Sequence, residues 1–438
     1  MSGAFDLQAE KQDKNRTVCQ FDLTGATDVD TQSLGNTGAT LQSANASCTG
    51  GGGPIKITGG PALAPFAPYF KGIKYVQNIQ IPGASMYLVN VDLSIEDSTF
   101  TGLQERGNAV LSFVNSKVTI LNSSFSGGAN SAAGAVYANQ SSQVTILDSM
   151  FLGNSGGQGG AVATWDSSIL VNGSTFSGNL GNGQGGGLSI MNGTTVFLTD
   201  NTFEENSANN GGGVYVDVCG SAVLEGNSFQ GNQVQHSGGG VFLVECNAQL
   251  SDNTFEKNRG TNGAAVWQNN CRQVLYTHNN LTANVASAGS GGLEINQGSA
   301  NITQCTFTLG KGVKGGGVYM QGVTGTISDC VFERNAVSQF GGAVFRGTSK
   351  GDLYGCEFTG NTAVRSGAVI YDSHCVGDIG LNVFSNNKAR GDNSVIFRTE
   401  SQGNVKGDNK GLTANLVHVD NNGAANQDYG DPNSATGS

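Results

Sequence analysis

Residues 203–218 read FEENSANNGGGVYVDV, and this stretch decides the fold because close copies of it recur along the chain. Phe203 is followed by Asn206, then by the cluster Gly211-Gly212-Gly213, and then by Val214-Tyr215-Val216-Asp217-Val218. The alternating run predicts a short β-strand, and the adjacent glycines predict a tight turn. No stretch nearby carries the three-to-four-residue apolar spacing of a helix.

The repeat has a period of about 26 residues. Its aromatic position is occupied by Phe in all copies but one, and an Asn usually follows three residues later. The copies are Phe100, Phe125, Phe151, Phe176, Phe203, Phe229, Phe255, Leu281, Phe307, Phe332, Phe358 and Phe384. The asparagines are Asn154, Asn179, Asn206, Asn232, Asn258, Asn284, Asn335, Asn361 and Asn387.

Two further apolar columns accompany the Phe column. One stands five residues before it, from Ile95 to Ile379, and is always apolar. The other follows it by eleven or twelve residues, after the glycine cluster: Val136, Val162, Leu188, Val214, Val241, Val266, Leu293, Val318, Val344, Val369 and Val395. Each period therefore supplies three inward-pointing anchors on short strands.

These features predict an all-β fold, a right-handed, single-stranded parallel β-helix of about 12 coils. One coil cannot bury its own apolar side, whereas stacked coils turn each anchor column into a continuous interior ladder. We expect the Phe rings to stack inside, the Asn amides to hydrogen-bond from coil to coil, and the glycines to adopt positive φ.

Composition narrows the function. Glycine supplies 68 of 438 residues, charged residues only 13%, and the formal net charge is −11. That negative charge disfavours a nucleic-acid partner. No run approaches the 18 apolar residues of a transmembrane segment, and we find no secretory leader in the chain as given.

The glycine-rich cluster and the F-x-x-N motif together resemble the repeat of the polymorphic outer membrane protein family. The cluster reads GGAV at Gly159–Val162 and at Gly341–Val344, and the resemblance covers about residues 90–400. It implies an extracellular parallel β-helix of the adhesin or autotransporter-passenger type. We find neither a leader nor a carboxy-terminal segment of barrel-forming strands in the chain as given, and this departs from the pattern of that family.

The ends of the chain lack the period. We expect an N-terminal cap over residues 1–70, the β-helix over 71–400, and a C-terminal cap with a disordered tail over 401–438. The tail is expected from the polar residues after about 420.

Enzyme chemistry finds little support in the residues. Polysaccharide-active enzymes also use this fold, but the sequence has neither an Asp-Asp pair nor a Gly-His-Gly. Loop positions are expected for the four histidines, and no cofactor or metal site is evident. The nearest acidic groups are Asp28 with Asp30, the trio Asp92, Glu96 and Asp97, and Glu204 with Glu205.

The cysteines fall into columns. Cys219, Cys246, Cys271 and Cys375 share one column, and Cys305, Cys330 and Cys356 share a second in which Ser or Asn stands in other coils. Buried thiols are one reading. The other is disulfides, because coil spacing of about 4.8 Å lies in the range for a disulfide. We predict one bond within Cys219, Cys246 and Cys271, and we expect an oxidising compartment. Further disulfide candidates are Cys305, Cys330, Cys356, Cys19 and Cys48.

A binding surface is predicted next to the Val column. The residue after an inward anchor points outward, which aligns Tyr137, Tyr215, Phe242, Trp267, Tyr319 and Phe345 into what we call the aromatic stripe. It could contact a glycan or a protein, or it could form a second small core beneath a loop. We therefore expect a non-enzymatic, extracellular or cell-surface adhesin-like protein. A carbohydrate-active enzyme or its inactive relative, and a cell-wall or filament scaffold, remain alternatives.

Overall fold

The computed structural model describes residues 109–420 without a break. Before them it describes the segments 7–11, 17–22, 56–58, 69–70, 75–77, 80–82, 86–89, 92–97 and 99–101. The chain divides into two compact units, Met1–Gly220 and Ser221–Ser438, and each is described by itself. Both units are built from the same three-strand coil, so the all-β parallel solenoid with a period of about 26 residues is confirmed.

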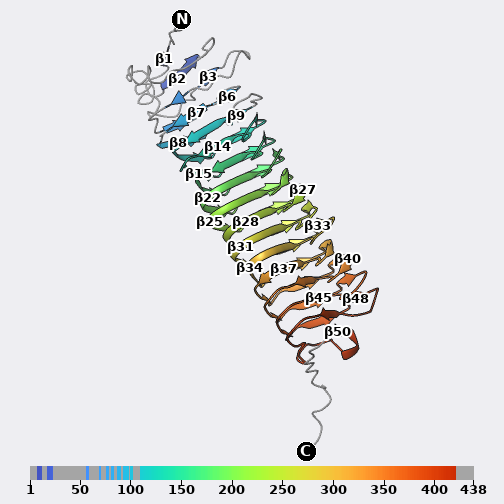
Figure 1. Ribbon diagram of the computed structural model, residues 1–438. Coiled ribbons are helices and arrows are strands. Elements are labelled where there is room, and N and C mark those ends of the chain that lie inside the picture. Colours follow the sequence, from blue (N-terminus) through green and yellow to red (C-terminus); the bar gives the residue numbers. More distant parts are fainter. Residues whose placement is uncertain are drawn as a thin grey trace, which may run out of the picture. The chain divides into compact units, whose positions relative to one another are not determined.

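In the first unit, three ladders of parallel strands pair from coil to coil (Figure 1). The Phe ladder holds β9 (Thr99–Thr101), β12 (Ser124–Ser126), β16 (Met150–Leu152), β20 (Thr175–Ser177) and β23 (Thr202–Glu204). A short ladder after the Asn position holds β13 (Ala129–Asn130), β17 (Ser155–Gly156), β21 (Leu180–Gly181) and β24 (Ser207–Asn210). The third holds β10 (Leu111–Val114), β11 (Lys117–Leu121), β14 (Val136–Asn139), β15 (Gln143–Leu147), β18 (Val162–Trp165), β19 (Ser168–Asn172), β22 (Leu188–Thr199) and β25 (Val214–Glu225).

Upstream strands extend these ladders. The segments are β1 (Leu7–Lys11), β2 (Thr17–Asp22), β3 (Lys56–Thr58), β4 (Tyr69–Phe70), β5 (Tyr75–Gln77), β6 (Gln80–Pro82), β7 (Met86–Val89) and β8 (Asp92–Glu96). Strands β4, β5 and β6 pair in parallel with β7, β8 and β9, as successive coils do. Strands β1 and β2 pair antiparallel. Most of the predicted cap, residues 1–70, lies outside the described residues.

The second unit repeats the pattern. Its Phe ladder holds β26 (Ser228–Gln230), β29 (Thr254–Glu256), β32 (Asn280–Thr282), β35 (Thr306–Thr308), β39 (Val331–Glu333), β43 (Glu357–Thr359) and β47 (Val383–Ser385). The ladder after the Asn position, which we call the short-strand sheet, holds β27 (Gln233–Ser237), β30 (Arg259–Gly260), β33 (Val285–Ala286), β36 (Lys311–Lys314), β40 (Ala336–Phe340), β44 (Thr362–Ala363) and β48 (Lys388–Ala389).

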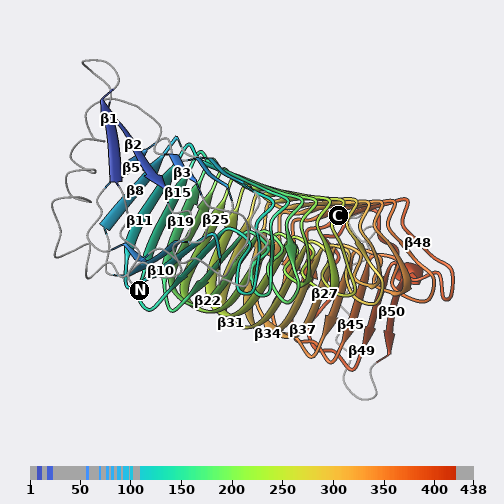
Figure 2. The same ribbon diagram turned by 90° about the horizontal axis from the view of Figure 1, so that it is seen from above.

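The third ladder of this unit follows the glycine cluster. It holds β28 (Val241–Ser251), β31 (Val266–Thr277), β34 (Leu293–Thr303), β37 (Val318–Thr324), β38 (Ile327–Ser328), β41 (Val344–Gly347), β42 (Leu353–Tyr354), β45 (Ile370–Ser373), β46 (Ile379–Gly380), β49 (Ile396–Thr399) and β50 (Val417–Asp420). Strands β31, β34, β37, β45 and β49 follow one another in a row in Figure 2. Because β50 pairs in parallel with β49, coil pairing runs past the boundary predicted at residue 400. A single 3-10 turn, Ala414–Leu416, precedes β50.

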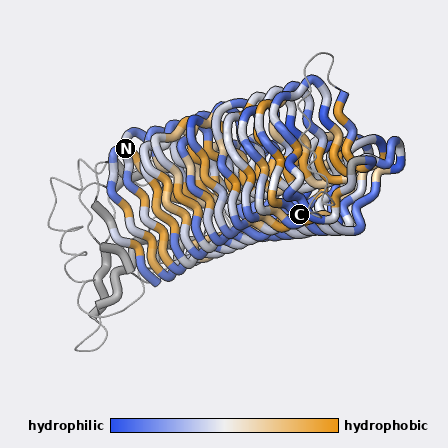
Figure 3. Tube along the Cα trace, turned by 90° about the horizontal axis from the view of Figure 1, so that it is seen from below, coloured by the Kyte–Doolittle hydropathy of each residue, from blue (hydrophilic) through white to orange (hydrophobic). Residues whose placement is uncertain are grey.

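The interior of each unit is made of the predicted columns. In the first unit, Phe100, Phe125, Phe151, Phe176 and Phe203 stack at 4.5–5.0 Å between ring centroids. In the second, Phe307, Phe332 and Phe358 continue the pattern at 4.7–4.9 Å. Figure 3 shows hydrophobic positions recurring side by side in successive coils. The Phe column is therefore interior, as predicted.

The Asn column forms the expected amide ladder. The Asn232 side-chain amide donates to Asn258 Oδ1 at 3.0 Å, and Asn258 donates in turn to Asn284 Oδ1 at 3.0 Å. The same oxygens accept backbone N–H groups of the preceding coil, at 3.0 Å from Asn232. Since these asparagines are fully buried, the ladder satisfies main-chain groups that no water reaches.

One predicted column is wrong in its last two coils. We assigned Val369 and Val395 to the anchor column, but Val344 pairs with Ile370 and Ile370 with Ile396. The error arose because two adjacent apolar residues, Val369-Ile370 and Val395-Ile396, compete for the anchor position in these coils. The true register places Tyr371 and Phe397 in the aromatic stripe.

Candidate functional site

The aromatic stripe exists as a register column. In the second unit Phe242 pairs with Trp267, Trp267 with Glu294, Glu294 with Tyr319, and Tyr319 with Phe345. The stack continues through Tyr371 and Phe397 to His418, at 4.6–5.4 Å between rings. Tyr371 and Phe397 were missed because of the register error above, and His418 because its segment was assigned to the C-terminal cap and tail.

The stripe is not freely exposed. Phe242 and Phe345 are only 8% and 6% exposed, while Trp267 and Tyr319 are half-buried. Phe242 and Trp267 stack at 4.5 Å, and Tyr319 and Phe345 at 5.0 Å, so each ring covers the face of its neighbour. A sugar ring needs such a face for stacking. The expectation of projecting rings is therefore wrong for the buried members, and a binding role stays a prediction for the exposed ring edges.

The first unit gives the same result. Tyr215 is 6% exposed, and burial raises the pKa of its hydroxyl, with Asp217 adding to the effect. Tyr137 packs against a small cluster of Ala109, Ala133 and Ala163. Of the two readings that the sequence left open, these residues fit the second small core.

Glu294 interrupts the stripe. The residue is 7% exposed, and its carboxylate accepts backbone N–H groups of Gly263 at 3.0 Å and Ser290 at 3.1 Å. Burial raises the pKa of Glu294, and the two hydrogen bonds oppose that rise. The carboxylate thus ties the glycine loops of two coils to the sheet.

The cysteines are structural. The residues Cys219, Cys246, Cys271, Cys305, Cys330, Cys356 and Cys375 are buried thiols, so the disulfide predicted within the first column is not present. Cys246 and Cys305 each donate their backbone N–H at 3.4 Å to a thiol sulfur of the next coil, Cys271 and Cys330. In the same way, the backbone N–H of Ser123 donates to the hydroxyl oxygen of Ser149 in the next coil at 3.0 Å. The parallel side chains stack as a hydrogen-bond ladder instead of converging on one another.

Two consequences follow for the thiols. The hydrogen bond with Cys330 and burial together raise the pKa of Cys305, so the reactive thiolate is scarce. Because the described cysteines form no disulfide, they give no support to the oxidising compartment expected from the sequence. Cys48 lies outside the described residues, and Cys19 lies in a strand whose side chains are not described.

Among the acidic candidates that the structure describes, no three gather into one group. Asp97 is exposed in a turn at φ 48° and accepts the Asn122 amide at 2.6 Å, as part of a turn ladder. Glu205 likewise occupies a turn at φ 52°. Asp28, Asp30 and the Asp92 side chain are not described. Among the described residues, no three His, Cys, Asp or Glu side chains form a group suited to a metal ion.

A buried ion cluster was missed by the sequence analysis. Asp372, fully buried, accepts Arg346 Nε on Oδ1 at 2.8 Å and Arg346 Nη2 on Oδ2 at 2.6 Å, and Arg398 Nε lies 3.3 Å from Oδ2. The two guanidinium groups also donate to backbone carbonyls, Arg346 to Gly351 at 2.7 Å and Arg398 to Gly403 at 2.8 Å. The cluster fixes the last coils from inside. Its signal was an Arg, an Asp and an Arg at one-coil intervals on an inward column.

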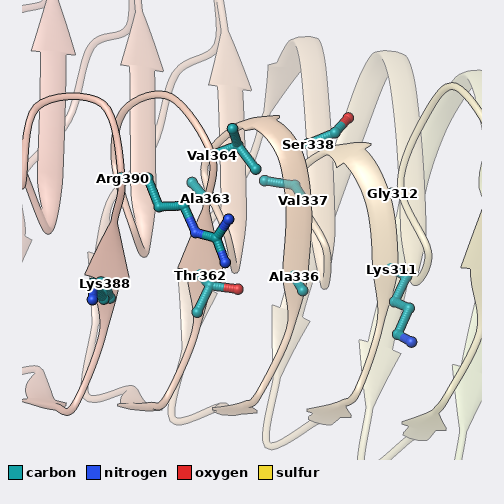
Figure 4. A pocket seen from close by; sticks show the side chains of 10 residues that line it. All are labelled: Lys311, Gly312, Ala336, Val337, Ser338, Thr362, Ala363, Val364, Lys388 and Arg390. Carbon is teal, nitrogen blue, oxygen red and sulfur yellow. The ribbon is translucent and has the colours of Figure 1, made fainter.

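The second unit also carries an open groove of about 450 Å³ on the short-strand sheet (Figure 4). Strands β36, β40, β44 and β48 and the residues just after them line it. The lining residues are Lys311, Gly312, Ala336, Val337, Ser338, Thr362, Ala363, Val364, Lys388 and Arg390. Between the charged residues the lining is small and apolar, with Val337 and Ala363 buried, and two hydroxyls interrupt it. We call this surface the cationic groove.

Register places the charges of the cationic groove. Lys311 pairs with Ala336, Ala336 with Thr362, and Thr362 with Lys388, so the two lysines stand three coils apart in one exposed column. At a coil spacing of about 4.8 Å, this separation is about 14 Å. Figure 4 shows the lysines at opposite ends of the row, with the Arg390 side chain pointing toward Thr362 in this view.

No carboxylate lines the cationic groove. Among the described residues, the ion pairs involve other cations, namely Lys257, Arg334, Arg346, Arg398, Lys406 and His374. Two more cations lie in neighbouring positions, Lys314 at 4.9 Å from the Phe345 ring centre and Arg365 at 5.5 Å from that of Phe340. The groove is thus a local positive surface on a chain of net charge −11.

Comparison with known proteins identifies the class. The family model described as a right handed beta helix region matches residues 77–233 and 134–307, which together cover more than half of the chain. The protein belongs to this right-handed β-helix family. No curated protein matches the sequence.

One solved structure that is similar is the Streptococcus pneumoniae surface protein and adhesin PfbA. It is 13% identical, and the match covers 87% of this chain and 97% of that one with a TM-score of 0.26. A spatial agreement this loose transfers no function. Among the described residues, no helix has the length and apolar character needed to cross a membrane.

Proposed function

We propose that this protein is a non-enzymatic β-helix protein of the cell surface or the extracellular space, with an adhesin-like binding role. The observation that carries the proposal is the cationic groove. Its three exposed cations have no carboxylate in their lining, and an acidic protein that only needed solubility would not concentrate positive charge there. Such a surface favours capture of a ligand of opposite charge.

Three carboxylates that could take part in acid–base chemistry have structural partners, which supports a binding role over catalysis. Asp372 is held by two arginines, Glu294 by two backbone N–H groups, and Asp97 by the Asn122 amide. Hydrolysis of a glycosidic bond needs a pair of carboxyl groups flanking the scissile bond. The cationic groove offers none.

A surface location is supported by the repeat, whose GGAV and F-x-x-N motifs are similar to those of extracellular passengers. The buried thiols are compatible with it, because they are shielded from oxidants and their thiolate forms are disfavoured.

Two measurements on the full chain test the proposal. Binding is screened on arrays of glycans and of extracellular proteins. In parallel, the polysaccharides that bind are incubated with the protein and assayed for new reducing ends and for unsaturated uronate. We expect binding without turnover. Turnover, or the absence of any ligand on both arrays, would contradict the proposal.

A further inference from the structure

We infer that the cationic groove is a binding site for a linear acidic polysaccharide that runs across the coils of the second unit. This inference rests on the proposed binding role and adds the ligand class and its position. The positive charge of the groove supports an acidic ligand. Lys311, Lys388 and Arg390 are exposed, and none has an ion pair among the described residues, so their charge is available to a ligand.

The shape of the groove also suits such a ligand. The groove is open, and its lining between the charged residues is small and apolar: Ala336 is partly exposed, Val364 is exposed, and Val337 and Ala363 are buried in the sheet beneath. Side chains this small let a chain molecule lie close to the sheet, and they suit the apolar faces of sugar rings. The hydroxyls of Ser338 and Thr362 add hydrogen-bonding groups between the charged ends. A ligand that spans the groove meets positive charge at both ends of an apolar floor.

The strand pairing beneath the groove favours a polysaccharide over an acidic peptide. An extended peptide usually binds a sheet by adding a strand to a free edge. Strand β40 is paired on both sides, with β36 and with β44, and β44 is paired with β48 as well. The floor of the groove therefore offers a peptide no free main-chain partners.

The side-chain composition of the groove favours a polysaccharide over single-stranded nucleic acid, because the bases of single-stranded nucleic acid stack on aromatic rings. No aromatic side chain lines the groove. The nearby Phe340 has its ring engaged by Arg365 at 5.5 Å and by Tyr371 at 4.6 Å. The recognition groups that remain are cations, hydroxyls and small apolar side chains, which match acidic sugars.

The test compares two variants of the full chain that lose three positive charges each. The groove variant carries Lys311→Gln, Lys388→Gln and Arg390→Gln. The control carries Lys257→Gln, Arg272→Gln and Arg334→Gln, at exposed positions of the same unit outside the groove. Circular dichroism melts should match wild type for both, because all six side chains are exposed.

The probes are heparin, whose acidic groups include sulfates, and polygalacturonate, which is carboxylated. Dextran serves as the neutral polymer, and poly-glutamate and single-stranded DNA serve as other polyanions. We expect wild type to bind heparin or polygalacturonate, the groove variant to bind about tenfold or more weakly, and the control variant to bind as wild type does. Affinity should fall as salt screens the exposed charges. Binding of heparin alone identifies sulfate as the recognised group, and binding of polygalacturonate alone identifies carboxylate.

Three results would overturn the inference. One is equal loss of affinity in both variants, which would show net charge acting alone. Another is binding of poly-glutamate or DNA as tight as that of the polysaccharides. The third is no binding of either acidic polysaccharide by wild type at low salt. The wider binding role would survive that third result if another ligand were found on the arrays, so the two proposals fail separately.

Discussion

Replacing Asn258 with Ala tests the amide ladder that joins the coils. Asn258 Oδ1 accepts the backbone N–H and the side-chain amide of Asn232, both at 3.0 Å. Its own amide donates to the Phe229 carbonyl at 2.9 Å and to Asn284 Oδ1 at 3.0 Å. The substitution therefore removes four hydrogen bonds at a fully buried site.

The magnitude follows from the groups left behind. A buried polar group that loses its partner costs about 1–3 kcal/mol. The Asn232 N–H and the Phe229 carbonyl are the main losses, because Asn284 Oδ1 still accepts the Asn258 backbone N–H at 2.9 Å. We expect Asn258→Ala to lower the free energy of unfolding by about 3–5 kcal/mol. Replacing the exposed Asn280 with Ala in the same unit should change it by less than about 0.5 kcal/mol.

Asn258→Asp adds a pH test of the same geometry. The introduced carboxylate could accept from Asn232 but would face two oxygen acceptors, so its folded-state pKa should rise. A raised folded pKa gives stability that is fully present below the unfolded value of about 3.9 and is lost as the pH rises. Urea unfolding followed by circular dichroism, with hydrogen exchange over residues 229–284, measures both effects. A cost below about 1 kcal/mol for Asn258→Ala, or no added pH dependence for Asn258→Asp, would refute the ladder.

Four more predictions follow from buried groups. Phe255→Ala removes a ring that is 1% exposed and stacked on Phe229 at 4.8 Å, and it should cost about 3–5 kcal/mol in thermal denaturation; a loss below about 1 kcal/mol would place the ring outside the core. Asp372→Asn leaves two buried guanidinium groups without their counter-charge and should cost about 3–5 kcal/mol in urea unfolding, whereas an unchanged midpoint would mean that the charges reach solvent. The seven buried cysteines should react with a thiol reagent only after unfolding and without added reductant; a need for reductant would reveal disulfides. Because burial raises the folded pKa of Glu294, its favourable contribution is complete below the unfolded value of about 4.3 and is lost as the pH rises, so Glu294→Gln should gain stability relative to wild type as the pH rises above about 4.3. Parallel stability curves for those two proteins would contradict the burial of the carboxylate.

The fold could be predicted from the sequence because the repeat encodes it redundantly. Each coil repeats apolar residues at the same interior positions, so one irregular copy such as Leu281 does not hide the Phe column. The register failed only where two adjacent apolar residues compete for one anchor, as at Val369 and Ile370. Periodicity cannot choose between them, because that choice depends on how the turn before them closes.

The functional surfaces were harder to predict. An outward column predicts direction but not exposure, and the stripe rings bury one another by stacking, as Phe242 and Trp267 do. The cationic groove joins Lys311, Lys388 and Arg390, which look like scattered charges in the sequence. Only the pairing of β36, β40, β44 and β48 brings them to one surface.

The most direct test measures whether an acidic polysaccharide binds and whether it stays intact. Polygalacturonate and heparin of known length are titrated into the full chain by calorimetry, and each polymer is then recovered and sized by chromatography. We predict that at least one of the two polymers binds with an affinity that falls steeply with salt, and that this polymer is recovered at its original length. Binding by neither polymer would contradict the ligand class assigned to the cationic groove, and recovery of shortened chains would contradict a binding role without catalysis.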